Sequence, residues 1–99
     1  MDLQIINNKG TFEIHGNLTH ENTNYAKDYF NMLLDTYYEV VICLKKVNKI
    51  DKPALSVLKF ISEKAKKRSK TLFVLGEENK SIKKIIANAG LNSIFKNDY

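Results

Sequence analysis

The sequence predicts an α/β fold in which helices pack on a mixed β-sheet, in the order β-β-α-β-α-β-α. Three observations favour this class. Two short apolar runs flank Asn8-Lys9-Gly10, whose residues are typical of a hairpin turn. Two continuous apolar runs, 40–44 and 71–75, are typical of parallel strands covered on both faces. Segments with apolar residues at three- and four-residue steps precede the first of these runs and follow both, which indicates helices.

The hairpin strands are residues 3–7 and 11–15, and we expect them to pair antiparallel. Residues 20–37 then change to helical spacing, with Thr19 and Asn22 as candidate N-caps. The apolar face of this first helix comprises Ala26, Tyr29, Phe30, Leu33 and Tyr37. We expect this face to pack against the sheet.

A second helix opens at Pro53, because proline is best tolerated in a first turn, where its missing N–H is not needed. The residue before a proline avoids the helical region, so we expect Lys52 to be the N-cap and Asp51 to lie just outside the helix. The buried stripe is Ala54, Leu58, Ile61 and Ala65, flanked by Val57 and Phe60. The opposite stripe, which we expect to face solvent, is Lys52, Ser56, Lys59, Glu63 and Lys66.

The strand 71–75 ends at Gly76, and a third helix follows, with Asn79 as its candidate cap and Gly90 as a left-handed stop. The apolar face of this helix is Ile82, Ile85, Ile86 and Ala89. Because helices connect the later strands, these strands should run parallel, joined by right-handed crossovers. The residues that we expect in the core are Val41, Ile42, Leu44, Leu58, Ile61, Leu72, Phe73, Val74 and Ile86.

Length and composition fit a single domain over residues 1–99. A chain of this length buries more than about 60% of its unfolded surface, and no repeat or flexible linker divides it. The lone Cys43 excludes an internal disulfide and offers no metal-ligand pair. No apolar stretch approaches the ~20 residues that span a bilayer, and the N-terminus lacks the layout of a signal peptide. We therefore expect a cytoplasmic protein without a cofactor.

The net charge of +5 comes almost entirely from lysine, since 15 of the 16 basic residues are Lys. Residues 45–70 hold ten basic side chains against Asp51 and Glu63, a local balance of +8, whereas the rest of the chain sums to −3. This Lys cluster fits two explanations, a solvated helix face and a surface for a partner. Proteins that read nucleic acid favour Arg for its bidentate donor fork, so we do not expect a nucleic-acid partner.

Residues suited to catalysis are scattered along the chain. His15 and His20 stand five residues apart, and no cluster of Cys, Asp or Glu completes a zinc-like spacing. Glu77 and Glu78 follow Gly76 in a solvated loop. The sequence has no phosphate-binding glycine loop and no nucleophile elbow. We therefore expect neither enzymatic activity nor a metal site.

Three short segments lie at the boundaries of the predicted helices: 16–19 before the first helix, 51–55 at the start of the second, and 89–95 at the end of the third. They read Gly-Asn-Leu-Thr, Asp-Lys-Pro-Ala-Leu and Ala-Gly-Leu-Asn-Ser-Ile-Phe. Together they resemble the STAS domain, the module named for sulphate transporters and anti-sigma factor antagonists, over residues 3–95. In that family the second segment usually reads Asp-Ser-Ser-Gly-Leu.

The resemblance implies a non-enzymatic interaction domain. Stand-alone bacterial members bind an anti-sigma factor kinase through this turn and the start of the second helix, and phosphorylation of a Ser in the turn blocks the binding. The phosphoacceptor position matches Lys52 and the second Ser matches Pro53, so the usual switch is absent. The expected partner-binding residues belong to the 50–67 turn and helix: Asp51, Lys52, Pro53, Ser56, Lys59, Glu63 and Lys66.

Two alternatives remain open. Similar STAS domains are small cytoplasmic subunits of ABC-type lipid transporters, where they dock on an ATPase. The other alternative is a polyanion binder that uses the Lys cluster, against which stand the scarcity of Arg and the missing base-stacking landmarks. If a kinase acts on the chain, Ser56 and Thr19 are the candidate acceptors. The sequence names neither the partner nor the oligomeric state.

Overall fold

Residues 2–95 are described by the computed structural model, and they form five strands, three α-helices and one 3-10 turn. The elements are β1 (Leu3–Asn8), β2 (Thr11–Leu18), α1 (Thr23–Thr36), β3 (Glu39–Cys43), β4 (Val47–Ile50), α2 (Lys52–Lys67), β5 (Thr71–Leu75), α3 (Lys80–Asn88) and the 3-10 turn Asn92–Ile94. The α/β class expected from the sequence is confirmed, as are the antiparallel hairpin and the parallel later strands.

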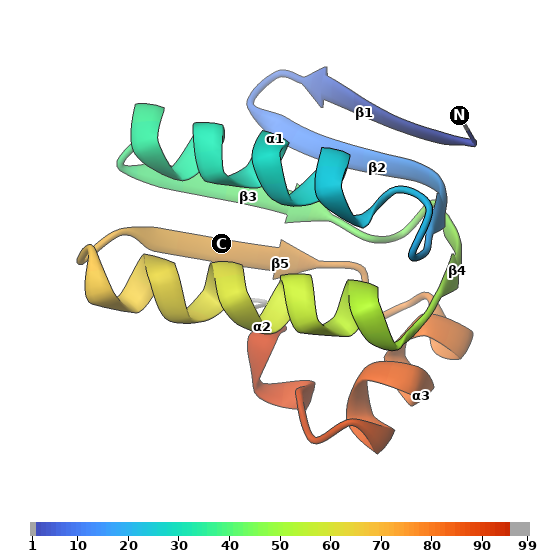
Figure 1. Cartoon of the computed structure of the whole chain (residues 1–99). Coiled ribbons are helices and arrows are strands. Elements are labelled where there is room, and N and C mark those ends of the chain that lie inside the picture. Colours follow the sequence, from blue (N-terminus) through green and yellow to red (C-terminus); the bar gives the residue numbers. More distant parts are fainter. Residues whose placement is uncertain (1, 96–99) are drawn as a thin grey trace.

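The sheet is built around β2. β1 pairs antiparallel with it across a two-residue turn, where Lys9 and Gly10 have φ angles of +53° and +92°. On its other side β2 pairs parallel with two strands in succession, β3 along residues 11–13 and β4 along residues 16–18. β5 lies parallel beyond β3, so the order across the sheet is β1-β2-β3-β5 (Figure 1).

The sequence did not predict β4. Val47 lies opposite Gly16 and Ile50 lies opposite Leu18, and both apolar ends of the strand are buried. Its two central residues are polar and exposed, so the segment has no alternating pattern of its own. The strand matters for the site because it leads directly to the start of α2.

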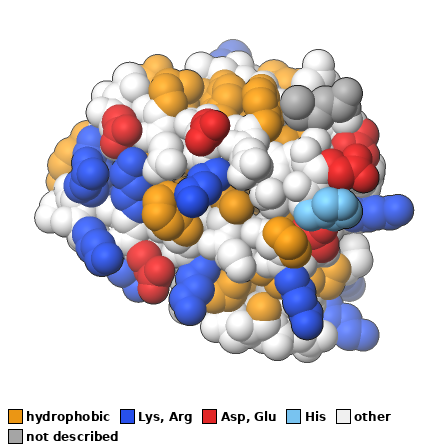
Figure 2. All heavy atoms as spheres, viewed as in Figure 1, with side chains coloured by type: hydrophobic (Ala, Val, Ile, Leu, Met, Phe, Trp, Pro, Cys, Tyr) orange, Lys and Arg blue, Asp and Glu red, His pale blue; other side chains and the backbone are white. Residues whose placement is uncertain are grey.

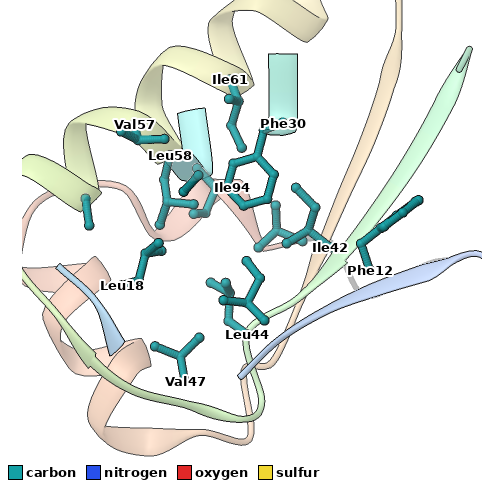
Figure 3. Packing of buried hydrophobic residues seen from close by; sticks show 14 of the residues in the cluster. Phe12, Leu18, Phe30, Ile42, Leu44, Val47, Val57, Leu58, Ile61 and Ile94 are labelled. Atoms are coloured by element: carbon teal, nitrogen blue, oxygen red, sulfur yellow. The ribbon is translucent and has the colours of Figure 1, made fainter. Parts of the chain in front are cut away.

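Helices α1 and α2 lie side by side over the same face of the sheet, and α3 packs against β4 at one end (Figure 1). Figure 3 shows Phe30 of α1 and Leu58 and Ile61 of α2 gathered beside Ile42 of β3. All four side chains are at most 1% exposed. The core therefore lies between this helical layer and the sheet.

Eight of the nine predicted core residues are buried, although one of them, Val41, lies outside the cluster between the helices and the sheet. Phe73 is only partly buried, so its place among the core residues was wrong. The reason is the two-residue period of a strand: Leu72 and Val74 point toward the helices, and Phe73 between them points to the opposite face of the sheet.

Of the two predicted N-caps of α1, Asn22 is confirmed by its position and Thr19 is wrong. The helix begins at Thr23, and Asn22 occupies the N-cap position without a capping hydrogen bond. The Asn22 side chain is 2% exposed and instead donates to Asp2 Oδ1 at 2.9 Å and to the carbonyl of Asn17 at 2.7 Å. Asn22 thus ties the chain start to the end of β2, and Thr19 lies outside the helix as part of the preceding turn.

The starts and stops of the other helices follow capping chemistry. In α2 the N-cap is Asp51 and not Lys52, which corrects the sequence-based assignment. Pro53 is the second helical residue, where its missing N–H is still not needed, and Lys52 can therefore be the first.

Asn79 caps α3 through Ile82 N–H, as predicted. Gly90 has a φ of +74°, which confirms the left-handed stop after α3.

Candidate partner-binding surface

The turn before α2 is organised by the Asp51 carboxylate. Asp51 has an extended backbone and accepts a hydrogen bond from Ala54 N–H through Oδ1 at 3.2 Å. Its carbonyl accepts from Leu55 N–H at 3.0 Å, the first bond of the helix. A carboxylate in this position satisfies a free N–H and also interacts favourably with the helix dipole.

The second oxygen of Asp51 reaches a distant part of the chain. Oδ2 accepts from the backbone N–H of His20 at 2.8 Å, and His20 Nδ1 lies 3.4 Å away. The His20 side chain is 71% exposed and the Asp51 side chain 31%. The β2–α1 connection is therefore bound to the start of α2, and His20 lies beside this turn, a position that the sequence did not predict.

These contacts set the ionisation of Asp51. Partial burial alone would raise the pKa of Asp51, but the hydrogen bonds from the N–H groups of His20 and Ala54 outweigh it, so that the pKa lies below its ordinary value. The carboxylate is thus held in its charged form, which is the form that caps the helix.

The sequence-predicted stripe on α2 is exposed along its whole length. Lys52, Ser56, Lys59, Glu63 and Lys66 all face solvent, and we call this set the outer face of α2. The Ser56 hydroxyl donates to the carbonyl of Lys52 at 3.3 Å. Within residues 2–95 no ion pair engages the charged members of the set. Figure 2 shows basic side chains spread over this helical side of the molecule.

Part of the Lys cluster is neutralised by α1 and does not belong to the outer face. Lys64 Nζ lies 2.9 Å from Asp35 Oδ1 and 2.8 Å from Asn31 Oδ1, with its side chain only 14% exposed. Arg68 Nη1 lies 3.7 Å from the same Asp35 oxygen. The pKa of Asp35 is lowered, first by the hydrogen bond from Lys64. The local charge of +8 therefore overstates what a partner would meet.

The remaining predicted residues lie around the same turn. Pro53 is exposed in the first turn of α2, next to Lys52. Thr19 is partly buried in the β2–α1 connection, and its carbonyl accepts from Asn22 N–H at 2.8 Å. Thr19 adjoins His20, which contacts Asp51, so both candidate phosphoacceptors lie near the start of α2.

Other site classes have little structural basis in the described part of the chain. His15 Nε2 lies 3.0 Å from Glu13 Oε1 on β2, and within residues 2–95 no three metal-ligating side chains come together. None of the helices among these residues is long and apolar enough to cross a membrane.

The chain is similar to a known protein family in sequence and to solved structures in fold. The sequence model of the family described as STAS domain matches residues 1–98. No curated protein matches the chain. An anti-sigma factor antagonist from Mycobacterium paratuberculosis shares the fold at 18% identity, with a TM-score of 0.71 over 94% of this chain and 80% of that one. The Bacillus cell fate determinant SpoIIAA in the phosphorylated form does so at 11% identity, with a TM-score of 0.69 over 98% and 91%.

Proposed function

Because this chain belongs to the STAS domain family, we propose that it is a regulatory protein-interaction domain of the anti-sigma factor antagonist type and not an enzyme. Its partner is an anti-sigma factor or a related kinase in the cytoplasm. The partner binds the Asp51–Pro53 turn and the outer face of α2. The shared fold with an anti-sigma factor antagonist supports this class of function.

The observation that supports the site is the outer face of α2 itself. Five exposed side chains follow one side of a helix whose start is fixed by Asp51 and His20. Since no ion pair within residues 2–95 engages Lys52, Lys59 or Lys66, their charges are free for a partner. A fixed helix start beside unpaired charges suits recognition by a second protein.

The charge of this face suits an acidic partner. Its three lysines outnumber the single Glu63, and Lys52 stands at the first position of the helix, where the helix dipole adds partial positive charge. Carboxylates on a partner would be attracted both by the lysine side chains and by the helix dipole. Association should therefore slow and weaken as salt concentration rises.

The site works without the serine switch of the family. Lys52 and Pro53 have no hydroxyl, and a phosphate group would bring roughly −2 charge to the turn, whereas Lys52 brings +1. The partner would accordingly bind constitutively. Ser56 and Thr19, near the start of α2, are the candidate acceptors if a kinase acts on the chain.

A binding titration with the partner captured from the source cell tests the proposal. Lys52→Glu combined with Lys59→Glu should weaken binding several-fold and flatten its dependence on salt, because two attractive charges become repulsive. The matched control is Lys80→Glu with Lys84→Glu, two exposed lysines of α3. This control should bind like the unaltered chain.

Equal binding by the double variant and the unaltered chain would place the interface elsewhere. The identity of the captured protein separates the remaining functions. An anti-sigma factor or kinase supports the proposal, whereas a transporter ATPase would assign the chain to a lipid transporter. Retention on a polyanion with the same loss in both variant pairs would indicate a nonspecific charge effect.

A further inference from the structure

The outer edge of β1 is an open edge of the sheet (Figure 1). Within residues 2–95 no strand pairs with it, whereas at the opposite edge of the sheet Phe95 forms a bridge to Val74 of β5. β1 has six residues, with no charged side chain, no proline and no bulge. Natural edge strands are usually protected by one of these devices. Without them, this edge is available for pairing.

The backbone groups of β1 alternate between β2 and the open side. Asn17 N–H donates to the carbonyl of Asp2 at 3.0 Å, one step beyond the last pair of the ladder, Leu3 and Gly16. Even-numbered residues of β1 therefore direct their N–H and C=O groups to β2. Leu3, Ile5 and Asn7 direct theirs outward, with Ile5 at the centre of the three.

We propose that this edge pairs with the same edge of a second copy of the chain, antiparallel and about a two-fold axis at Ile5. In this register Ile5 faces Ile5 of the second copy, and Leu3 of each chain faces Asn7 of the other. All the outward groups of the three residues then form ladder hydrogen bonds. A two-fold axis at Leu3 or Asn7 would leave some of them unpaired, so the register at Ile5 satisfies the edge most fully.

Charge favours a second copy in this orientation. Asp2 stands before β1 and Lys9 stands after it, and both are exposed, while β1 itself is neutral. In the proposed register, Asp2 of each copy faces Asn8 of the other and lies diagonal to Lys9, whereas a parallel pair would bring like charges together. The charged Asp2 carboxylate also accepts hydrogen bonds from Asn17 and Asn22 of its own chain. The edge is thus complementary to itself.

The pairing also covers exposed apolar surface. Ile6 is 38% exposed and points to the sheet face away from α1 and α2, since it stands opposite Glu13 and not opposite the buried Phe12. In the paired sheet Ile6 lies opposite Gln4 of the second copy and loses part of this exposure.

The outer face of α2 remains accessible in such a pair. α2 packs against α1 and β5, and β5 and β1 form opposite edges of the sheet. The pair would therefore present two partner-binding faces, which raises the avidity for a partner that is itself paired.

The oligomeric state of the whole chain tests this proposal. Sedimentation over a range of protein concentrations should show a monomer–dimer equilibrium. Gln4→Lys with Ile6→Lys should raise the dimer dissociation constant by about tenfold or more, because each new lysine faces a lysine of the second copy. The control, Ala87→Lys with Asn88→Lys, adds the same charge to exposed positions of α3 and should leave the constant unchanged. A chain that stays monomeric up to about 1 mM, or equal dimerisation of both variants, overturns the proposal.

Disulfide trapping tests the register without relying on a destabilised variant. In a Cys43→Ser background, one protein carries Gln4→Cys and another carries Ile6→Cys. These two positions face each other in the proposed pair as a non-hydrogen-bonded pair, with Cα atoms about 4.5 Å apart, within disulfide reach. Oxidation of the mixture should give covalent dimers in higher yield than oxidation of either protein alone. Equal yields from mixed and unmixed samples would exclude this register.

Discussion

The two faces of α2 are interleaved along the same sixteen residues but have opposite surroundings. Ala54, Leu58 and Ile61 are 0% exposed against the sheet and α1, whereas Lys52 and Lys59 face solvent. Substitutions on the buried face act on stability, because cavities and lost contacts are costly in a packed interior. Substitutions on the outer face should act on association, because those side chains face solvent. The two properties of α2 can therefore be changed separately.

The largest effect should come from the buried face. Leu58→Ala removes a fully buried side chain and leaves a cavity between α2 and the sheet, so the free energy of unfolding should fall by about 2–5 kcal/mol. Urea denaturation followed by circular dichroism measures this change. A loss below about 0.5 kcal/mol would mean that Leu58 does not contribute to the core, and the contrast between the faces would fail.

An intermediate effect is expected at Asp51, where the two faces meet at the helix start. Asp51→Ala removes the cap of α2 and the bond to His20 N–H, which should cost about 1 kcal/mol. Asp51→Asn keeps an oxygen that can accept from Ala54 N–H and should cost less at pH 7. Equal losses in the two variants would show that the charge of Asp51, and not its hydrogen bonds, stabilises the turn.

The stability that Asp51 contributes should depend on pH. The pKa of Asp51 is lower in the folded chain than its ordinary value of 3.8. Its stabilising effect is therefore complete above the ordinary value and is lost as pH falls through the lowered value. The stability difference between the unaltered chain and Asp51→Asn should shrink as pH falls below about 4. Denaturation curves at several pH values measure it, and a difference that grows on acidification would contradict the assignment.

The outer face should tolerate charge reversal. Lys52→Glu improves the interaction with the helix dipole, and Lys59→Glu places a like charge one turn before Glu63, so the two effects largely cancel. The free energy of unfolding of the double variant should change by less than about 0.5 kcal/mol, which thermal denaturation can check. A larger loss would mean that weakened partner binding in this variant reflects unfolding.

The smallest effect is expected for Ser56→Ala. The Ser56 hydroxyl bonds only the preceding turn, and Ala is the better helix former, so stability should rise by about 0.5 kcal/mol or less. Incubation with an anti-sigma-class kinase and ATP, followed by intact-mass measurement, extends this test. We expect no phosphate on the Lys52–Pro53 turn, and an adduct that disappears in Ser56→Ala would reveal a displaced switch.

The course of α2 could be predicted from sequence because its apolar residues repeat with the helical period. The prediction held for the buried stripe and for the exposed stripe alike. β4 could not be predicted in this way, since only its ends, Val47 and Ile50, are apolar and its pairing with β2 is a tertiary contact. The prediction that Phe73 lies in the core was wrong for a related reason: an unbroken apolar run does not indicate which of its residues face the helices.

The site was predicted in part. The turn and the exposed stripe follow from sequence position, but the N-cap was assigned one residue too late because Pro53 was placed at the first helical position. The contact between Asp51 and His20 spans 31 residues, and no local pattern indicates it. Likewise, the pairing of Lys64 with Asp35 removes charge from the Lys cluster in a way that counting along the chain cannot reveal.

The contacts of Lys64 with Asp35 and Asn31 should affect the conformational entropy that α2 loses when a partner binds. These contacts hold α2 against α1 near the end of α2, and Asp51 holds its start against the β2–α1 connection. A helix held at both ends loses little conformational entropy when another molecule docks on it. Less of the free energy of the contacts would then be spent on ordering α2, so that an interface of a given size along this helix would bind more tightly than one on a mobile segment.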